Sequence, residues 1–353
     1  MSSSQAPPVR LEAVRLEDVA QELSTLALAA RNVFATWEWM STWWRHFGAG
    51  HQALVTACRG ADDRVIGVLP FYLWASRPLR ILRFIGHGGG DQLGPVYAAQ
   101  DEPAVADATR RTLERLRWDA FVGDQLPAPA RWSSVLGAKV LVREGNPVLR
   151  APEGGWDGFL AGRSPNFRQQ LRRRERRLAR EHRLTFRLVR DAAELPSALD
   201  ALFRLHALRW SNGSPFQARE AFHREFAALG FQRGWTRVWL LELDGQAVAA
   251  WYGLRFAGAE CYYQAGRDPA WDHRSVGSVL LAHSIRAAFQ DGIKEYRFLR
   301  GHEAYKYRFA MEDPGLETIA LTRGPVARLA LSAARRAYPV VKGRIGGLRW
   351  KLV

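Results

Sequence analysis

The sequence predicts a mixed α/β protein (α+β-like) made of two tandem domains, each a mostly antiparallel mixed sheet flanked by helices. Three observations support this prediction. An antiparallel meander in the second half runs directly into a strand, a loop, a helix and a further strand. The first half repeats that order of elements, and 353 residues suit two domains of ordinary size. Because identity between the halves is slight, we interpret the repeat as an ancient duplication.

In the first half, an aromatic-rich segment predicts the opening helix, and a polar turn at residues 60–63 separates the strands that follow. A glycine-rich loop then precedes a second helix. The predicted elements are, in order, a helix at 34–44, strands at 65–73 and 79–85, the loop at 86–90, a helix at 104–116 and a strand at 120–122.

In the second half, Asp244-Gly245 is the strongest two-residue hairpin signal, and the runs on either side of it are rich in apolar residues. Asp291-Gly292 marks the end of a helix. The predicted elements are, in order, a helix at 195–210, strands at 238–243, 246–256 and 261–264, a helix at 279–289 and a strand at 295–299.

The loop before the last of these helices is the most informative segment of the chain. Ser275 is expected to cap the helix, and Gly277 keeps its first turn bare. The unpaired amides at the helix start then face outward at the positive end of the helix dipole, as a cradle for a diphosphate. The predicted cofactor-binding residues are Arg274, Ser275, Val276, Gly277 and Ser278.

This loop and the meander before it resemble the GCN5-related N-acetyltransferases (GNAT), whose signature is Arg/Gln-x-x-Gly-x-Gly/Ala. Arg274-x-x-Gly277 matches it, and Val279 stands where the signature has a small residue. Further motifs make the chain similar to the CelD-like (cellulose biosynthesis type) acetyltransferases, a GNAT branch related to Fem-type aminoacyltransferases. These motifs are Phe167-Arg-x-x-Leu171, Leu205-His206-x-x-Arg209-Trp210, Gly266-x-Asp268-Pro269 and Gly301-x-Glu303-x-Tyr305-Lys306.

The resemblance implies two GNAT-like domains, a degenerate one at residues 10–150 and one with the acyl-CoA site at 151–325, followed by a basic amphipathic tail at 326–353. It also implies transfer of an acetyl or other acyl group from acetyl-CoA or another acyl-CoA. The implied acceptor is an amine or hydroxyl of a cell-envelope, polysaccharide or small molecule.

Direct transfer from a thioester needs a base for the nucleophile, donors for the oxyanion and an acid near the departing thiolate. Glu303 is the candidate base, or else an exposed loop carboxylate, and Tyr305 is the candidate acid, or else a half-buried aromatic. Lys306 is one of five lysines beside 46 arginines, which points to an ammonium held near an anionic group, or to chance. We expect these three side chains in one cleft that faces the thioester.

Candidate substrate contacts lie in both halves. His206, Arg209 and Trp210 share one motif, although His206 also falls on the apolar stripe of its helix, where a core histidine is the alternative. Asp268 contacts substrate or anchors the Asp-Pro turn.

In the first half, His87 and Asp91 are expected on a wall of the acceptor site, or on a flexible glycine-rich loop. Glu102 puts a negative charge near the helix start where a phosphate would need to lie. We therefore expect this half to have lost cofactor binding.

Positive charge is concentrated in two segments. Residues 163–190 hold 11 arginines against two glutamates, and residues 323–353 hold eight basic residues and no acid. The first segment predicts a helix, with Ser164 as its cap and Pro165 at its first position, that binds an anionic substrate or an RNA backbone or has a solvated basic face. The second predicts a helix that rests on anionic lipid, or packs on the catalytic domain with a frayed end.

The composition and motifs also narrow the location and the chemistry. The start of the chain has no signal-peptide pattern and no 18-residue apolar run is present, so we expect a cytoplasmic protein, at most peripheral to the inner face of the membrane. His302-Glu303 lacks the second histidine of a zinc-protease motif, and no nucleophile elbow is present, so no metal or serine mechanism is expected.

Two alternatives to acyl-CoA-dependent transfer stay open. One is Fem-type transfer from aminoacyl-tRNA, with the arginine-rich helix on the RNA. The other is a non-catalytic adaptor that binds RNA or membrane. The expected partner is otherwise a small-molecule or glycan-precursor acceptor, and nucleic acid is not expected unless tRNA is the donor.

Overall fold

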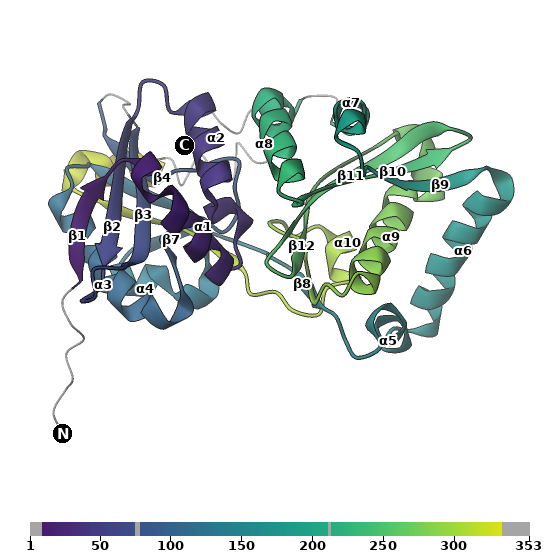
Figure 1. Ribbon diagram of the computed structural model, residues 1–353, viewed down its shortest axis with the longest axis horizontal. Helices are drawn as coiled ribbons and strands as arrows, with labels where there is room; N and C mark the ends of the chain where they lie inside the picture. The colour runs from purple at the N-terminus through teal and green to yellow at the C-terminus, as the bar shows by residue number, and fades with distance from the viewer. Residues whose placement is uncertain (1–8, 75–77, 211–212, 334–353) are drawn as a thin grey trace. The chain divides into compact units, whose positions relative to one another are not determined.

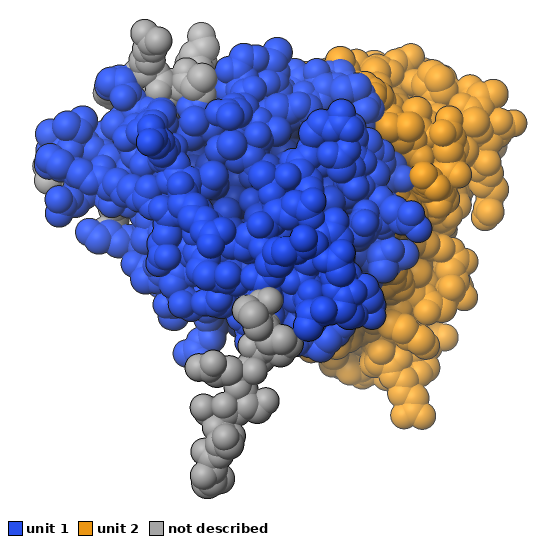
Figure 2. Space-filling model, turned by 60° about the vertical axis from the view of Figure 1, so that its left-hand side comes forward, with its two compact units in different colours: residues 1–145, 314–345, 351–353 blue, residues 146–313, 346–350 orange. Residues whose placement is uncertain are grey.

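The computed structural model describes residues 9–74, 78–210 and 213–333. These residues form two compact units (Figures 1 and 2). Of the described residues, those up to 145 and those at 314–333 belong to unit 1, and those between 146 and 313 belong to unit 2. Each unit is a mostly antiparallel mixed sheet flanked by helices, which confirms the predicted fold class. Among the described helices, none is long and apolar enough to cross a membrane.

Unit 1 has an eight-stranded sheet in the order β1-β2-β3-β4-β6-β14-β7, with β5 paired to β3. Its one parallel pair, β4 with β6, is registered at Ile81↔Ala120 and Leu82↔Phe121. The strands are β1 (Arg10–Val14), β2 (Gln52–Arg59), β3 (Val65–Trp74), β4 (Ile81–Phe84), β5 (Val96–Tyr97), β6 (Ala120–Pro127), β7 (Lys139–Glu144) and β14 (Leu316–Thr322). The α-helices are α1 (Ala20–Ala29), α2 (Trp37–Phe47), α3 (Glu102–Arg115) and α4 (Trp132–Leu136), and the 3-10 turns are η1 (Leu16–Val19), η2 (Val33–Ala35), η3 (Ala99–Asp101) and η4 (Ala128–Ala130).

Unit 2 has a six-stranded sheet in the order β8-β13-β12-β11-β10-β9, in which only β12 and β13 are parallel. The strands are β8 (Val148–Arg150), β9 (Leu184–Leu188), β10 (Thr236–Leu243), β11 (Gln246–Phe256), β12 (Ala259–Arg267) and β13 (Glu295–Arg297). The α-helices are α5 (Gly155–Ala161), α6 (Pro165–Glu181), α7 (Leu195–Arg209), α8 (Glu220–Gln232), α9 (Val276–Gln290) and α10 (Ala304–Tyr307), and the 3-10 turns are η5 (Ala192–Glu194), η6 (Gln217–Arg219) and η7 (Pro269–Arg274).

The unit boundaries differ from the predicted domain limits at 150 and 325. β8 pairs with β13 in unit 2, and β14 returns to unit 1 and pairs with both β6 and β7. Glu317 on β14 also pairs with Arg143 at 3.0 Å. The C-terminal strand is therefore part of the first sheet, a pairing across more than 170 residues that local sequence signals do not carry.

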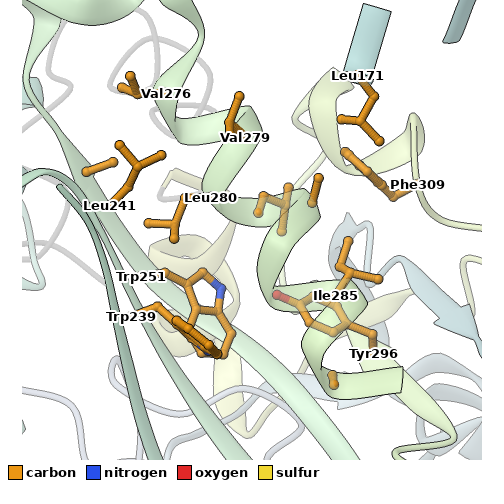
Figure 3. Close-up of a cluster of buried hydrophobic side chains, with 14 of the residues drawn as sticks. Leu171, Trp239, Leu241, Trp251, Val276, Val279, Leu280, Ile285, Tyr296 and Phe309 are labelled. Carbon is orange, nitrogen blue, oxygen red and sulfur yellow. The ribbon is translucent and has the colours of Figure 1, made fainter. Parts of the chain in front are cut away.

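Helices cover both faces of the sheet in unit 2, with α7 and α8 on one face and α9 on the other (Figure 1). α9 buries its apolar face against the sheet, where Leu280 lies close to Trp251 and Ile285 close to Tyr296 (Figure 3). Gly253 is required beside this indole, because a Cβ there would lie 2.0 Å from the ring of Trp251. Full burial of each such apolar side chain contributes about 1.5–3 kcal/mol, so this layer fixes α9 on the sheet.

α6 begins as predicted, with Pro165 in its first turn. The Ser164 hydroxyl accepts a hydrogen bond from the amide of Phe167 at 3.2 Å. Leu171 and Leu178 are its buried residues and join the same hydrophobic cluster as α9. The remaining faces of α6 are polar, so the helix is held by one narrow seam.

Candidate functional site

A cavity of about 340 Å³ lies in unit 2 beside the start of α9. It forms where β12 loses its neighbour: β13 pairs with β12 only from Ala259↔Glu295 to Cys261↔Arg297, whereas β12 continues to Arg267. The unpaired half of β12 therefore borders a gap in the sheet. A bulge adds to it, since Tyr252 pairs with Gln264 and Gly253 with Tyr262.

The cavity reaches both faces of the sheet. Side chains alternate along a strand, and both alternating sets line it: Ala250 and Gly266 on the face of α7, and Trp251 on the face of α9. Helix residues from the two sides line it as well, Arg209 from α7 and Leu280 from α9. A donor that enters along α9 and an acceptor on the α7 side can thus meet within one space.

The start of α9 offers fewer free donors than the predicted anion cradle has. Ser275 adopts the left-handed conformation (φ 58°) and its side chain does not cap α9, which corrects that part of the prediction. The amide of Ser275 donates to the Asp272 carbonyl and that of Ser278 to the Ser275 carbonyl, both at 3.0 Å. Of the next two amides, which lack a carbonyl one helical turn before them, that of Gly277 belongs to a residue of the cavity lining, and that of Val276 belongs to a fully buried residue.

Some of the predicted cofactor-binding residues line the cavity, and the others make contacts within the fold. Ser275, Gly277 and Ser278 line the cavity. Arg274 forms an ion pair with Glu181 at 2.5 Å, and is not part of the lining. Val276 is fully buried, backbone included, and is not part of the lining.

Sequence reasoning missed Arg267 and Asp272, which also line the cavity. Their side chains pair at 3.2 Å between Nη2 and Oδ2, and the hydrogen bond from Arg267 lowers the pKa of Asp272. A Cβ on Gly277 would lie 3.3 Å from Cδ of Arg267, so the glycine leaves room for the arginine as well as for a ligand. Neither residue belongs to a motif, and only the sheet register places them here.

Tyr305, the predicted acid, lines the cavity together with Tyr262 of β12. The two phenols are hydrogen-bonded to each other, and their rings lie 6.1 Å apart. Burial raises the pKa of both hydroxyls above the ordinary value of 10.0, and the negative charge of Glu303 raises them further. Both groups are therefore neutral near pH 7, and Tyr305 keeps a proton to donate.

Glu303 and Lys306 do not line the cavity with Tyr305. Lys306 is buried, and its ammonium donates to the carbonyls of Leu299 at 3.3 Å and Arg300 at 2.6 Å and pairs with Glu303 at 3.0 Å. Adjacent helix residues point about 100° apart, so Lys306 faces away from the side of α10 that carries Tyr305. The geometry gives Lys306 a role in holding the turn after β13, and a catalytic role for Glu303 or Lys306 stays a prediction.

Of the predicted substrate contacts, Arg209 lines the cavity, and its guanidinium lies 5.3 Å from the centre of the Trp210 ring. Trp210 is 43% exposed. His206 is buried, packs at 4.9 Å from Phe216, and has its pKa lowered to about 4, mainly by burial. Its geometry is that of a core histidine.

Asp268 accepts the amide of Ala270 at 2.9 Å and begins η7. This is the turn-anchoring alternative to a substrate contact. The turn sets the direction in which the chain passes from β12 to α9.

In unit 1, the counterpart of this loop is the glycine-rich loop at 86–90, and internal contacts fill it. The amides of Gly89 and Gly90 donate to the Gly86 carbonyl at 3.2 and 2.9 Å, and the indole of Trp43 donates to the His87 carbonyl at 3.0 Å. A Cβ at Gly86 would lie 3.2 Å from Nε1 of Trp39.

The two residues in or next to this loop that are predicted to contact the acceptor, His87 and Asp91, have contacts or burial within unit 1. The His87 ring lies 3.1 Å from the Tyr72 hydroxyl, and Asp91 is buried. Their contact with an acceptor stays a prediction.

The C-terminal tail is described only in part. Residues 324–333 are helical and belong to unit 1. Val326 and Leu329 are exposed, at 63% and 74%. Most of the predicted basic tail, from residue 334 onward, lies outside the described residues. Among the described residues, no group of three or more His, Cys, Asp or Glu side chains is arranged to hold a metal ion.

Comparison with known proteins agrees with this geometry. Residues 165–307, which include α6, α9 and Tyr305, match the family described as acetyltransferase (GNAT) domain. A search of curated proteins found no match.

Several solved structures share the fold. FemX is 10% identical with a TM-score of 0.61, covering 92% of this chain and 100% of its own. The C-terminal domain of a putative lysylphosphatidylglycerol synthetase from Agrobacterium fabrum is 13% identical with a TM-score of 0.56, covering 95% and 99%. L-PGS from Bacillus licheniformis is 10% identical with a TM-score of 0.52, covering 95% and 98%. The fold is therefore of the GNAT type and similar to that of FemX.

Proposed function

We propose that this protein is an acyl-CoA-dependent acyltransferase that acts on an amine or hydroxyl in the cavity of unit 2. The observation that carries the proposal is the cavity itself. It opens through a gap in the sheet, is lined at the start of α9 by Ser275, Gly277 and Ser278, and has the neutral phenol of Tyr305 in its wall.

In the proposed reaction, the diphosphate of the donor lies on the amide of Gly277, and the hydroxyls of Ser275 and Ser278 add donors beside it. The amine or hydroxyl attacks the thioester carbonyl carbon, and the carbon–sulfur bond breaks. Tyr305 donates its proton to the departing thiolate.

Glu303 accepts the proton that the nucleophile loses. Its carboxylate is half exposed and close enough to the phenol pair to raise the pKa of both hydroxyls. Positive charge from Arg209 and Arg267 in the lining stabilises the oxyanion of the tetrahedral intermediate. Within the GNAT type, we propose the CelD-like branch, on its four sequence motifs, and with it an acceptor from cell-envelope or polysaccharide synthesis.

A second candidate donor is aminoacyl-tRNA, as in Fem-type enzymes. The left-handed Ser275 favours it, because its own amide and that of Ser278 are bonded to carbonyls and so leave few donors for a diphosphate. The likeness to FemX adds support at the level of fold alone.

Acetyl-CoA and longer acyl-CoAs, tested with a panel of amines and alcohols, decide between the two donors. We expect acyl-CoA to raise the unfolding temperature and CoA thiol to be released when an acceptor is present. Tyr305→Phe should lower turnover by about tenfold or more with donor affinity unchanged. Tyr307→Phe is the matched control, because Tyr307 is an exposed tyrosine of the same short helix. Absence of both stabilisation and thiol release would exclude acyl-CoA as the donor.

A further inference from the structure

Helix α6 carries a row of five exposed arginines on the side opposite its buried seam. We call Arg172, Arg173, Arg176, Arg177 and Arg180 the arginine row. Their spacing of three and four residues places them on one face, along about 12 Å of helix. All of them line one shallow groove on the surface of unit 2.

The helix neutralises this row only in part with its own acids. Its two acidic residues both reach to other elements: Glu175 pairs with Arg286 of α9 at 3.3 Å, and Glu181 pairs with Arg274 before α9 at 2.5 Å. Glu181 is shared further with Arg177 and Arg180 at 3.2 Å each. Among the residues that the structure describes, no carboxylate pairs with Arg172, Arg173 or Arg176 within 4.0 Å.

Like charges at positions i and i+4 destabilise a helix, and this row has three such pairs: 172 with 176, 173 with 177, and 176 with 180. α6 nevertheless stays in place, because Leu171 and Leu178 anchor it in the core. A solvated basic face gains nothing from this arrangement, whereas a bound polyanion offsets the repulsion.

The shape of the row indicates the kind of polyanion. It is narrow and straight, so it fits a linear chain of phosphates better than a flat lipid surface. α6 carries none of the exposed large hydrophobic residues among the described positions, so it has no side chain to insert into a bilayer. The row also has no exposed aromatic residue on which bases could stack, which disfavours single strands.

We propose that α6 binds the phosphodiester backbone of a duplex nucleic acid through the arginine row. Over about 12 Å a duplex presents about seven backbone charges, enough to engage all five arginines. Guanidinium groups match phosphate oxygens in a two-pronged geometry. The contacts are made to the backbone, so binding is independent of base sequence.

This binding is independent of acyl-CoA-dependent transfer and is measured without any donor or acceptor. The probe is a fluorescein-labelled RNA duplex, followed by anisotropy at several salt concentrations with the full chain. We expect the logarithm of the affinity to fall with the logarithm of salt with a slope of about −4.

The test variant is Arg172→Gln/Arg173→Gln/Arg176→Gln, whose three side chains are exposed and make no ion pair with described residues. It should bind at least about tenfold more weakly, with a slope reduced by about three. The matched control is Arg110→Gln/Arg115→Gln/Arg117→Gln, which removes the same charge from exposed positions at and just after α3. The control should behave like the unaltered protein, and circular dichroism of both variants checks the fold.

The proposal is overturned if the unaltered protein does not bind the duplex at low salt, if both variants weaken binding equally, or if the test variant leaves the salt slope unchanged. Binding to phosphatidylglycerol vesicles is measured in parallel, to test whether the arginine row binds a lipid surface instead. If the test variant loses vesicle binding and keeps duplex binding, the row is a lipid surface and the proposal is wrong.

Discussion

Arg274 and Glu181 form an ion pair that fastens the loop before α9 to the last residue of α6, with 2.5 Å between Nη1 and Oε2. Both side chains are mostly buried, at 18% and 27% exposed. The next residue of the chain, His182, packs its ring 5.1 Å from that of Trp271 in the same loop. Contacts from α6 and from the residue after it therefore hold the loop that leads into α9. The side chain of Arg274 is used in these contacts.

Arg274→Gln should therefore lower the free energy of unfolding by about 1 kcal/mol, with the donor Kd changed by less than about twofold. Urea unfolding and calorimetry measure the two quantities. Combining it with Glu181→Gln should give a loss smaller than the sum of the single losses, because each change removes the same pair. A large rise in donor Kd for Arg274→Gln would instead place that side chain on the ligand.

Lys306→Met tests whether the buried ammonium holds the turn or performs chemistry. The substitution leaves two carbonyls and Glu303 without their donor, so we expect a loss of about 2–3 kcal/mol in the free energy of unfolding. Lys294→Met is the control, since Lys294 is exposed. If stability is kept while turnover falls by about a hundredfold, Lys306 acts in the transition state, as the sequence predicts.

The helices and the meander of unit 2 were predictable from sequence because their signals are local. The apolar stripe of α9, the Asp244-Gly245 hairpin and the Ser164 cap each lie within a few residues of the structure they cause. The place of Lys306 was not predictable in this way. Its carbonyl partners turn inward because Leu299 (φ 56°) and Gly301 (φ 131°) adopt positive φ, and no pattern in the sequence announces this.

The cavity was predictable only in part. Gly277 and Tyr305 were found through motifs, whereas Trp251 and Arg267 belong to ordinary strands. They reach the cavity because of a register, Trp251↔Ala265, set by the bulge in β12 and by the early end of β13. The left-handed Ser275 was missed for a similar reason, since serine at a helix start usually predicts a side-chain cap.

Histidine burial makes stability depend on pH. The pKa of His206 is lowered from 6.5 to about 4, mainly by burial, so the folded protein holds the imidazole neutral. Its contribution is complete above about pH 6.5 and is lost as the pH falls toward 4, because the unfolded chain takes up the proton first.

His206→Phe should reduce the loss of unfolding free energy between pH 6.5 and pH 4 by up to about 3 kcal/mol. His283, whose pKa burial also lowers to about 4, contributes to the remaining loss. The exposed His273 serves as the control in His273→Gln. Urea unfolding at several pH values measures the effect, and parallel curves for His206→Phe and the unaltered protein would contradict it.

One donor site per chain is expected, because the counterpart loop of unit 1 is filled by its own contacts. In unit 1, the loop amides are satisfied within the loop, Trp39 lies against its glycines, and α3 starts at Glu102 with Asp101 before it. Two carboxylates at that helix start repel a phosphate, since they occupy the positive end of the dipole themselves.

Calorimetric titration with acetyl-CoA should therefore give one equivalent. Gly277→Asp should abolish it, because a carboxylate would project beside the cradle amides next to Arg267. Gly162→Asp, at a glycine with φ −76° that ends α5, introduces the same charge elsewhere and should leave the titration unchanged. Two equivalents, or one equivalent that survives Gly277→Asp, would contradict this prediction. Either result would show that unit 1 binds the donor at its loop and helix, although internal contacts fill that loop.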